Sequence, residues 1–473
     1  MREYVPPPGS VATLDVPDLG SVRTIHLVGI GGAGMSGIAR LLLARGVRVT
    51  GSDLKGTPVL TQLRAAGAEV VVGHRAENVA QVDAVVISTA IPEDNPERIE
   101  ADHRAIPVYA RAQVMAFLMA ERRGIAVAGT HGKTTTTSMI AVILERAGLD
   151  PSYLIGGDLN ESGSNARSGG GDVFVAEADE SDGSFLLLSP EIAVITNVEP
   201  DHLDFFADGE EVEAAFGAFC RRAGSVIVCA DDAGARRAAG DAGVSTITYG
   251  EDPSSAVRII GAEASGRGGR ASLEIAEHSL ELSLSIPGRH QLVDAAGAVA
   301  ACMQVGVPPE LAVQALRGFT GVRRRFERRG SARGAEFVDD YAHHPTEISA
   351  TLAAARQDDG HRIIAVFQPH RYTRTRAMWR ALGESLAGAD VVVVTDVYGA
   401  GEVPEPGITG KLLVDSLQEA SPRTRTVYLP HRSDLPGFLA GEVRPGDLVL
   451  TLGAGDITSV GEEALVLMGE GHG

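Results

Sequence analysis

Short apolar runs alternate with stretches of helical spacing along the first part of the chain. Residues 23–34 read as a strand that runs into a glycine-rich turn, and residues 35–46 continue with helical spacing up to a glycine. Further short apolar runs stand at 47–53, 68–73, 83–89 and 106–109. Strands and helices in alternation predict a parallel, doubly wound sheet.

A second block with the same alternation opens near residue 121. Residues 125–148 read as strand, loop, helix and closing glycine, and further apolar runs follow at 172–182, 192–204, 226–232 and 245–250. From 257 to 286 apolar residues alternate with partly polar neighbours, which predicts antiparallel strands. Residues 287–306 then have the spacing of a helix.

A third block begins near residue 321 and is again typical of a doubly wound α/β fold. It holds four predicted strands with polar carboxyl ends, at 336–348, 362–376, 390–396 and 447–456. Ligands bind outside the carboxyl ends of such strands, so these polar clusters are candidate sites. We expect an α/β protein with a flexible N-terminal arm (1–20) and three domains at 21–120, 121–320 and 321–473.

Composition narrows the class of protein. The chain has 473 residues and a formal net charge of -20, which argues against a general binder of nucleic acid or of anionic membranes. Since no apolar run approaches about 18 residues, we expect no membrane span. The three cysteines lack metal-ligand spacing, and the N-terminus lacks the apolar segment of a secretion signal, so we expect a cytoplasmic protein.

The glycine-rich turn is the first candidate site. Gly29, Gly31 and Gly34 match G-x-G-x-x-G between a strand and a helix, and Asp53 closes the next strand. Backbone amides at such a turn attract a diphosphate. Read alone, the turn favours NAD, but any nucleotide diphosphate fits it, and so does a tight turn that binds no ligand.

The sequence GTHGKTT at 129–135 resembles the end of a phosphate-binding loop. Its spacing is shorter than the strict Walker A pattern, yet amides of the loop can cradle phosphates and Lys133 can reach the β- and γ-phosphates. Thr134 can ligate Mg²⁺ through its hydroxyl. Lysines number only three among 42 basic residues, so this one is informative. We expect an ATP or GTP site; the alternative is a surface loop.

Carboxylates gather after the strand that follows this loop. Glu177, Asp179, Glu180 and Asp182 stand in EADESD, and His202 ends another strand in NVEPDHLD. A phosphate-binding loop needs a carboxylate for its metal ion. Since Mg²⁺ rarely uses imidazole, the residue types alone leave His202 open as a ligand, a catalytic group or a structural histidine.

Arginine and histidine cluster in the last third. The segment VRRRFERRG (322–330) is either a solvated basic loop or the source of one arginine that stabilises phosphate charge in a transfer reaction. Two further clusters follow apolar strands, with the residues Asp340, His343, His344, His370, Arg371, Arg374 and Arg376. Guanidinium groups bind carboxylate and phosphate bidentately, so these predict a cationic pocket for a small anion; the alternative is solvated surface.

Taken together, these pieces resemble one family. GIGGAGMSG, GTHGKTTT, EADESD, NVEPDHLD, PGRH, RRF, DDYAHHPTE, FQPHRYTRT and LGAGDI follow one another over residues 25–457. The chain resembles the Mur ligases, and DDYAHHPTE, FQPHRYTRT and GIGGAGMSG resemble the branch that adds L-alanine. The resemblance implies a Rossmann-like N-terminal domain that binds UDP, a P-loop ATPase-like central domain with extra antiparallel strands, and a Rossmann-like C-terminal domain.

It also implies a reaction: ATP, UDP-N-acetylmuramate and L-alanine would give ADP, phosphate and the L-alanyl product through an acyl phosphate. Mg²⁺ would be held by Thr134, Glu177 and His202. The implied catalytic groups are Lys133, Glu177, His202, Arg325 and His344. The implied ATP contacts are Gly129, Thr130, His131, Gly132, Lys133, Thr134, Thr135, Gln291, Arg325 and Asp340. The implied substrate contacts are Gly29, Gly31, Gly32, Gly34, Asp53, His343, His344, His370, Arg371 and Arg374.

Two departures from the family pattern qualify the match. PGRH is commonly followed by N-x-x-N, where this chain has Gln291 and Asp294; an ionised Asp294 cannot donate a hydrogen bond to a nucleotide. Residues 203–254 contain no lysine that could be carbamylated, which agrees with the L-alanine-adding branch. The resemblance further implies a cytoplasmic enzyme, a monomer or homodimer, that binds neither nucleic acid nor membranes.

The alternatives are a ligase of the same family that recycles a tripeptide, an NAD-dependent oxidoreductase, and a nucleotide-binding protein without turnover. An oxidoreductase would have no use for the phosphate-binding motif GTHGKTT. A protein without turnover would have no use for the clusters of polar residues at 177–202 and 340–374.

Overall fold

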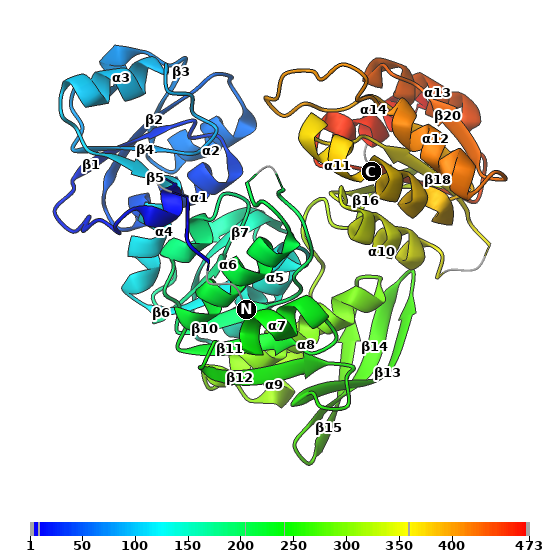
Figure 1. Cartoon of the computed structure of the whole chain (residues 1–473), viewed down its shortest axis with the longest axis horizontal. Helices are drawn as coiled ribbons and strands as arrows, with labels where there is room; N and C mark the ends of the chain where they lie inside the picture. The colour runs from blue at the N-terminus through cyan, green and yellow to red at the C-terminus, as the bar shows by residue number, and fades with distance from the viewer. Residues whose placement is uncertain (1–3, 8–9, 204, 241, 358–359, 470–473) are drawn as a thin grey trace.

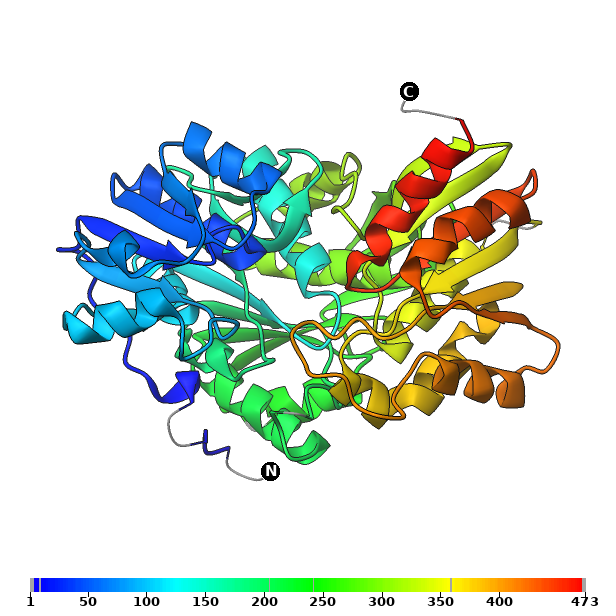
Figure 2. The same cartoon turned by 90° about the horizontal axis from the view of Figure 1, so that it is seen from above.

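The computed structural model describes residues 4–7, 10–203, 205–240, 242–357 and 360–469. Its strands form three separate sheets, and each sheet with its helices forms one lobe. Figure 1 shows the first lobe in blue and the third in orange and red on opposite sides of the molecule, with the central lobe between them. Figure 2, seen from above, shows the same arrangement.

The first lobe is built on a five-stranded parallel sheet in the order β3-β2-β1-β4-β5. Its central strand β1 is apolar and buried, as a parallel sheet covered on both faces requires. The strands are β1 (Thr24–Val28), β2 (Arg48–Asp53), β3 (Glu69–Val72), β4 (Ala84–Ile87) and β5 (Val108–Ala110). The helices are α1 (Ala33–Ala44), α2 (Pro58–Ala65), α3 (Pro96–His103) and α4 (Arg111–Ala120).

The central lobe holds a ten-stranded mixed sheet in the order β15-β14-β13-β12-β11-β10-β6-β9-β7-β8. The strands are β6 (Arg123–Ala128), β7 (Ser152–Leu159), β8 (Ser164–Arg167), β9 (Val173–Glu177), β10 (Ile192–Ile195), β11 (Ser225–Cys229), β12 (Ser245–Gly250), β13 (Val257–Ser265), β14 (Gly268–Ile275) and β15 (His278–Leu284). The helices are α5 (Lys133–Arg146), α6 (Gly209–Arg221), α7 (Ala233–Gly240), α8 (Arg289–Gln304) and α9 (Pro309–Leu316). The predicted antiparallel segment is confirmed, since β13, β14 and β15 pair antiparallel.

The third lobe has a six-stranded sheet in the order β16-β17-β21-β18-β19-β20, parallel except for the edge strand β16. The strands are β16 (Glu327–Ala332), β17 (Ala335–Asp340), β18 (Arg362–Phe367), β19 (Val391–Val394), β20 (Arg425–Tyr428) and β21 (Asp447–Leu452). The helices are α10 (Pro345–Ala355), α11 (Tyr372–Ser385), α12 (Lys411–Ala420), α13 (Leu435–Glu442) and α14 (Val460–Leu467). The predicted α/β class with doubly wound parallel sheets is confirmed.

Four strands fall outside the sequence-based expectation. The third block was expected to hold four strands and has six, because β16 and β20 were missed; β7 and β8 were missed in the central block. β8, β16 and β20 are edge strands with few buried residues, so they lack the apolar run that marks an inner strand. Among the described residues, no helix is both long and apolar enough to span a bilayer.

The first lobe packs closely on the central lobe through α1. Gly37 of α1 lies so near Leu154 of β7 that a side-chain carbon at Gly37 would collide with it. Asn165 of β8 donates a hydrogen bond to the carbonyl of Ala33 at the start of the same helix. The described part of the segment before β1 also touches the central lobe, where the ring of the buried Tyr4 lies against Phe206. The helix that follows the glycine-rich turn is therefore anchored in the central lobe.

Candidate active site

The loop after β6 has the backbone shape of a phosphate cradle. Gly129 has a φ of +147° and Gly132 a φ of +79°, in the region that favours glycine. A side chain at Gly129 would collide with Thr196, and one at Gly132 would come within 2.6 Å of Asp294. Gly132 also caps α5, whose first residue is Lys133, so the loop directs amides and a helix N-terminus to one place.

Lys133 is held inside the loop by its own surroundings. Its ammonium donates to the carbonyls of Gly129 and Thr130 and lies 2.9 Å from a carboxylate oxygen of Glu180. Burial alone would lower the pKa of Lys133, but the carboxylates of Glu180 and Asp179 raise it overall, so the lysine stays charged. Its ion-pair partner is thus Glu180, one of the four carboxylates of EADESD.

Glu177, at the end of β9, is placed to bind a cation. Its Oε1 atom is buried and has no hydrogen-bond partner among the described residues. Thr134 and Glu177 both lie against the glycine pair Gly156–Gly157 within β7. A buried carboxylate oxygen without a donor and a nearby hydroxyl fit an oxygen-binding cation such as Mg²⁺.

His202 joins the same cluster from another strand end. Its Nε2 atom lies 3.7 Å from Glu180 and 3.5 Å from Asp201. Burial lowers the pKa of His202, which leaves its imidazole neutral and able to act as a metal ligand. The structure therefore gathers Lys133, Glu180 and His202, which the sequence holds in three separate motifs.

A cavity of about 240 Å³ lies beside the loop, between the central and third lobes. The sequence-predicted ATP contacts that line it are His131, Gly132, Thr135, Gln291, Arg325 and Asp340. Further lining residues that sequence reasoning did not select are Asn197, Glu199, His290, Asp294, Thr346 and Glu347. Residues more than 200 positions apart thus meet at one cavity.

Gln291 and Asp294, the two departures from the family pattern, both face this cavity. Gln291 donates to His290, while its carbonyl Oε1 is buried without a partner among the described residues. Burial raises the pKa of Asp294 to about 7, although Arg325 and His131 lie close enough to lower it. A carboxyl with this pKa is partly protonated at neutral pH, so Asp294 can donate a hydrogen bond after all.

His131 connects the loop to the third lobe. Its Nε2 lies 3.3 Å from Glu199, and its Nδ1 lies 3.4 Å from Glu347. Burial alone would lower the pKa of His131, but the two carboxylates raise it to about 9. Hydrogen bonds at the N-terminus of α10 fix Glu347 in place. It is the third residue of that helix, and its carboxylate accepts from the backbone amides of His343 and His344.

The five arginines of 322–330 have different surroundings. Arg325 lies 3.4 Å from Glu347, has its guanidinium 5.2 Å from the ring centre of Tyr341, and lines the cavity. Asp340 accepts from the amides of Phe326 and Ala342, which fixes it beside Arg325. The other arginines pair with acidic side chains, as Arg323 does with Asp158, Arg324 with Asp339, Arg328 with Glu336 and Arg329 with Glu462.

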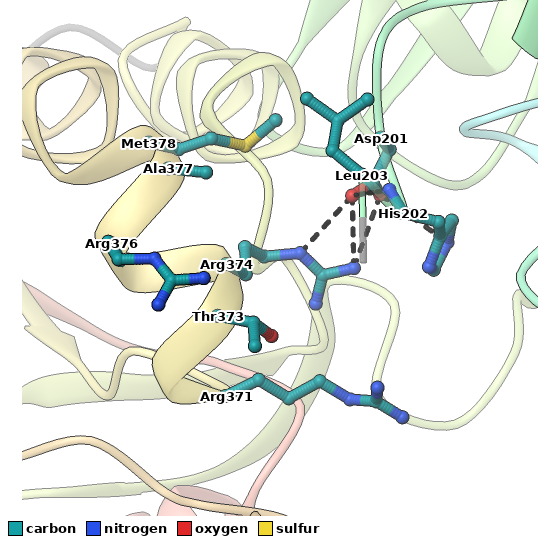
Figure 3. Close-up of a pocket in the computed structure, with 9 residues that line it drawn as sticks. All are labelled: Asp201, His202, Leu203, Arg371, Thr373, Arg374, Arg376, Ala377 and Met378. Atoms are coloured by element: carbon teal, nitrogen blue, oxygen red, sulfur yellow. Dashed lines mark hydrogen bonds and ion pairs between the residues drawn. The ribbon is translucent and has the colours of Figure 1, made fainter. Parts of the chain in front are cut away.

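A second cavity, of about 80 Å³, separates the central lobe from the start of α11 (Figure 3). Asp201 and His202 line one side, and Arg371 and Arg374 extend toward them from the other. We expected both arginines to bind a substrate carboxylate. The Arg374 guanidinium instead pairs with Asp201 at 3.2 Å, because the aspartate supplies the carboxylate itself.

The three candidate histidines of the third lobe, His343, His344 and His370, divide into two groups. The rings of His343 and His370 meet edge to face with their centres 6.0 Å apart, and His370 stacks on Tyr398. Burial lowers the pKa of His370 to about 3, so that ring is neutral. His344 turns the other way, with its ring centre 4.5 Å from that of His131. His344 therefore belongs with the phosphate-binding loop rather than with His370.

The glycine-rich turn of the first lobe borders a third cavity, of about 400 Å³. Ile91 and Arg111 line it, and they lie against Gly29 and Gly34. Some amides of the turn already have partners, since Gly29 donates to the carbonyl of Ser52 and Gly31 donates to the side chain of Asp53 at 2.9 Å. The side chain of Asp53 thus holds the turn in place through this hydrogen bond.

Several site residues escaped the sequence reasoning although they lay inside quoted motifs. Asn197 and Glu199 stand in NVEPDHLD, and Glu347 stands in DDYAHHPTE. Their place inside a motif was therefore the signal that could have found them. The segment 83–89, whose residues Ile87, Ser88 and Thr89 line the third cavity, was predicted only as a strand.

The chain matches three family models in order along its length. They are described as "Mur ligase family, catalytic domain" over residues 24–123, "Mur ligase middle domain" over 127–302, and "Mur ligase, glutamate ligase domain" over 324–455. Together they cover most of the chain.

Relatives and solved structures agree with these models. A UDP-N-acetylmuramate–L-alanine ligase of Saccharopolyspora erythraea is 50% identical over 94% of this chain and 93% of its own length. One of Rubrobacter xylanophilus is 50% identical over 93% of this chain and 99% of its own length. The crystal structure of the Thermotoga maritima UDP-N-acetylmuramate-alanine ligase has a TM-score of 0.81 at 30% identity, with 94% of this chain and 98% of that chain covered. A murein peptide ligase from Psychrobacter arcticus has a TM-score of 0.71 at 26% identity and covers 95% of this chain and 100% of its own.

Proposed function

The chain belongs to the Mur ligase family, and from that membership we infer that it joins L-alanine to UDP-N-acetylmuramate with the hydrolysis of ATP to ADP and phosphate. The observation that supports this most directly is the meeting of Lys133, Glu180 and His202 at the strand ends of the central sheet, opposite Arg325 and Arg371 of the third lobe.

The reaction needs an activated carboxyl group. A carboxylate oxygen of UDP-N-acetylmuramate attacks the γ-phosphorus of ATP, the bond to the β-phosphate oxygen breaks, and ADP leaves. The L-alanine amine then attacks the carbonyl carbon of the acyl phosphate, phosphate leaves, and the amine loses its proton. Both steps build negative charge on phosphoryl oxygens, so the site must supply cations.

We propose that ATP binds in the loop 129–135 with its nucleoside toward the 240 Å³ cavity. The charged ammonium of Lys133 would exchange its contact with Glu180 for the γ-phosphate. The guanidinium of Arg325 would act on the same phosphate from the third lobe, with Asp340 holding it in place. The orphaned carbonyl of Gln291 and the partly protonated Asp294 would contact the nucleoside.

Mg²⁺ fits the donors at this place, and we propose that Thr134 and Glu177 hold one ion and that His202 serves a second. The partnerless Oε1 of Glu177 supports this, since a bound cation would satisfy it. When bound, the ion neutralises charge on the transferred phosphoryl group. Glu180, which lies between Lys133 and His202, would keep both oriented.

The two substrates would enter from opposite lobes. The UDP group would occupy the 400 Å³ cavity beside Gly29, Gly31, Gly32 and Gly34, with Arg111 close to its diphosphate. L-alanine would occupy the 80 Å³ cavity, with its carboxylate on Arg371. The same carboxylate reaches Arg374 only if Asp201 releases it. His343, His344 and His370 would border this space.

The remaining expectations are proposals of the same kind. We propose domain limits at 21–120, 121–320 and 321–473 after a flexible arm at 1–20, a monomer or homodimer in solution, and action in the cytoplasm without nucleic acid or membrane partners. Sedimentation velocity checks the oligomeric state.

Phosphate release tests the function. Purified protein with Mg²⁺ and ATP receives UDP-N-acetylmuramate and L-alanine singly and then together. We expect release only when both are present, with stoichiometric UDP-N-acetylmuramoyl-L-alanine detected by mass spectrometry. Release with L-alanyl-D-glutamyl-meso-diaminopimelate in place of L-alanine would move the chain to the recycling branch. No release with either amine would contradict the ligase assignment.

A further inference from the structure

His131, Glu199 and His344 form a group of metal-ligand type that the proposed reaction does not require. One donor atom from each residue can be chosen so that all three lie within 4.8 Å of one another. His131 belongs to the phosphate-binding loop, Glu199 follows β10, and His344 caps the first turn of α10 in the third lobe. The group therefore exists only while the third lobe lies against the central lobe.

We propose that these three side chains bind a d-block divalent cation of the Zn²⁺ class, and that the bound ion blocks the nucleotide cavity. Two imidazole nitrogens and one carboxylate oxygen are donors that Zn²⁺, Co²⁺ and Ni²⁺ prefer. Mg²⁺ and Ca²⁺ prefer oxygen donors alone, so the catalytic cation is a poor competitor at this place.

The distances are close to those that such an ion needs. Metal–ligand bonds of about 2.0–2.1 Å in a tetrahedral arrangement place the donors about 3.3 Å apart. His131 Nε2 lies 3.3 Å from Glu199 Oε2, and His344 Nδ1 lies 3.8 Å from the same oxygen. The remaining edge joins the two imidazole rings, and one choice of donor atoms keeps all three edges within 4.8 Å, so the rings must draw together around a bound ion.

Neighbouring groups already orient the three ligands. Glu347 contacts the Nδ1 atom of His131, which leaves the Nε2 atom of that ring directed at Glu199. The raised pKa of His131 keeps a proton on this nitrogen, and a bound metal ion displaces it while Glu347 holds the proton on Nδ1. A carboxylate behind a histidine ligand is a common feature of zinc sites. Thr346 donates to Glu199 Oε2 at 2.8 Å and so fixes the carboxylate.

His344 supplies a second sign of a missing partner. Its Nε2 atom is buried and has no hydrogen-bond partner among the described residues, and its Nδ1 receives only a long hydrogen bond of 3.4 Å from Thr346. A cation at Nδ1, the atom that faces Glu199, would take the place of this long hydrogen bond.

The location explains the expected effect. His131 and Glu199 line the 240 Å³ cavity, so the fourth coordination position of the ion opens into it. An ion there also ties the loop 129–132 to α10 and prevents the lobes from separating. The inhibitory part of the inference rests on the proposed function, whereas the binding of the metal does not.

The test begins with metal alone. Full-length protein, stripped with a chelator and then freed of it, is titrated with Co²⁺ and Zn²⁺ in the presence of excess Mg²⁺ and without substrates. We expect one tight equivalent per chain and a visible absorption spectrum of Co²⁺ with fewer than six ligands. Binding that Mg²⁺ abolishes, or a spectrum of octahedral Co²⁺, overturns the proposal.

Variants locate the site. Glu199→Gln and His344→Ala should abolish the tight equivalent, and Glu347→Gln should weaken it by about 10- to 100-fold. His343→Asn is the matched control, because it removes the adjacent histidine and should keep the equivalent. A thermal melt of each metal-free variant checks folding, and the isosteric Glu199→Gln decides the matter if His344→Ala fails to fold. Binding retained in folded Glu199→Gln contradicts the assignment.

Inhibition is measured separately in the wild-type chain. With free Zn²⁺ fixed by a metal buffer, the apparent KM for Mg·ATP should rise and a chelator should restore it. Tight binding without this rise overturns the blocking role and leaves the binding result to stand. If the chain lacks ligase activity altogether, the spectroscopic titration still decides whether the ion binds.

Discussion

Two buried clusters of histidine and glutamate have similar residues and different settings. In the first lobe, Glu97 of α3 lies 3.5 Å from His26 and 3.1 Å from His74, and accepts from Ser52 at 2.6 Å. Between the central and third lobes, Glu347 lies 3.4 Å from His131 and 3.2 Å from His343. The first cluster joins strands and a helix of one lobe, while the second joins two lobes beside a cavity.

The difference shows how surroundings, rather than residue type, decide what such a cluster does. Glu97 is fully buried and its carboxylate is satisfied by several donors, so it secures one fold. The cluster around Glu347 includes the orphaned His344 and borders a nucleotide-sized region, so its groups remain available to ligands. Stability should therefore respond mainly to the first cluster and turnover mainly to the second.

The largest effect is expected next to the second cluster. Lys133→Ala removes the ammonium that the loop carries, and turnover should fall by about 10²- to 10³-fold or more. Phosphate release measures this, and isothermal titration with UDP-N-acetylmuramate should show little change because its proposed site lies in the first lobe. Equal turnover in the variant would contradict the assignment of the loop.

The first cluster should yield the largest loss of stability. Glu97→Ala leaves His26 and His74 buried without their carboxylate, and the free energy of unfolding should fall by about 3–5 kcal/mol. Urea denaturation measures this. Glu93→Ala, which changes an exposed glutamate of the same lobe, is the control and should stay near the parent value. If both variants unfold alike, the Glu97 cluster has no special role.

Lowering the pH should remove the contribution of the first cluster to the free energy of unfolding. Burial alone would raise the pKa of Glu97, but His26, Ser52 and Asn78 lower it from 4.5 to about 2. A lowered carboxyl pKa gives stability that is present above pH 4.5 and lost as the pH falls to about 2. The shift corresponds to about 3 kcal/mol. Unfolding measured across this window should show the gap between parent and Glu97→Gln closing; a constant gap would argue against it.

A smaller effect is expected when the pH is raised, because Asp294 lines the cavity beside the second cluster. Because the pKa of Asp294 is about 7, its carboxyl ionises above neutral pH. This carboxyl lies next to the phosphate loop, since a side-chain carbon at Gly132 would come within 2.6 Å of it. A new negative charge beside the phosphate loop should raise the KM for ATP by up to about tenfold between pH 6 and pH 8. Asp294→Asn should flatten this dependence. A parent profile that is already flat would contradict the prediction.

Apolar patterns predicted the class of fold and motifs supplied the candidate site residues, because both signals are local in the sequence. Inner strands such as β1 and β21 are apolar runs, and their carboxyl ends carry the polar residues. The edge strands β16 and β20 escaped prediction because solvent covers part of them and their residues are polar. Side-chain pairings could not be predicted for a different reason, because which of the four carboxylates of EADESD pairs with Lys133 depends on side-chain positions in three dimensions.

The 80 Å³ cavity has one further consequence. Its walls come from two lobes, with Asp201 and His202 on one side and Arg371 and Arg374 on the other. The space between them depends on how closely the lobes approach as well as on the side chains that line it. In the proposed L-alanine site, discrimination between amino acids of different bulk would therefore also depend on the segment that connects the lobes, and substitutions that never touch the amino acid would change the range of amino acids accepted.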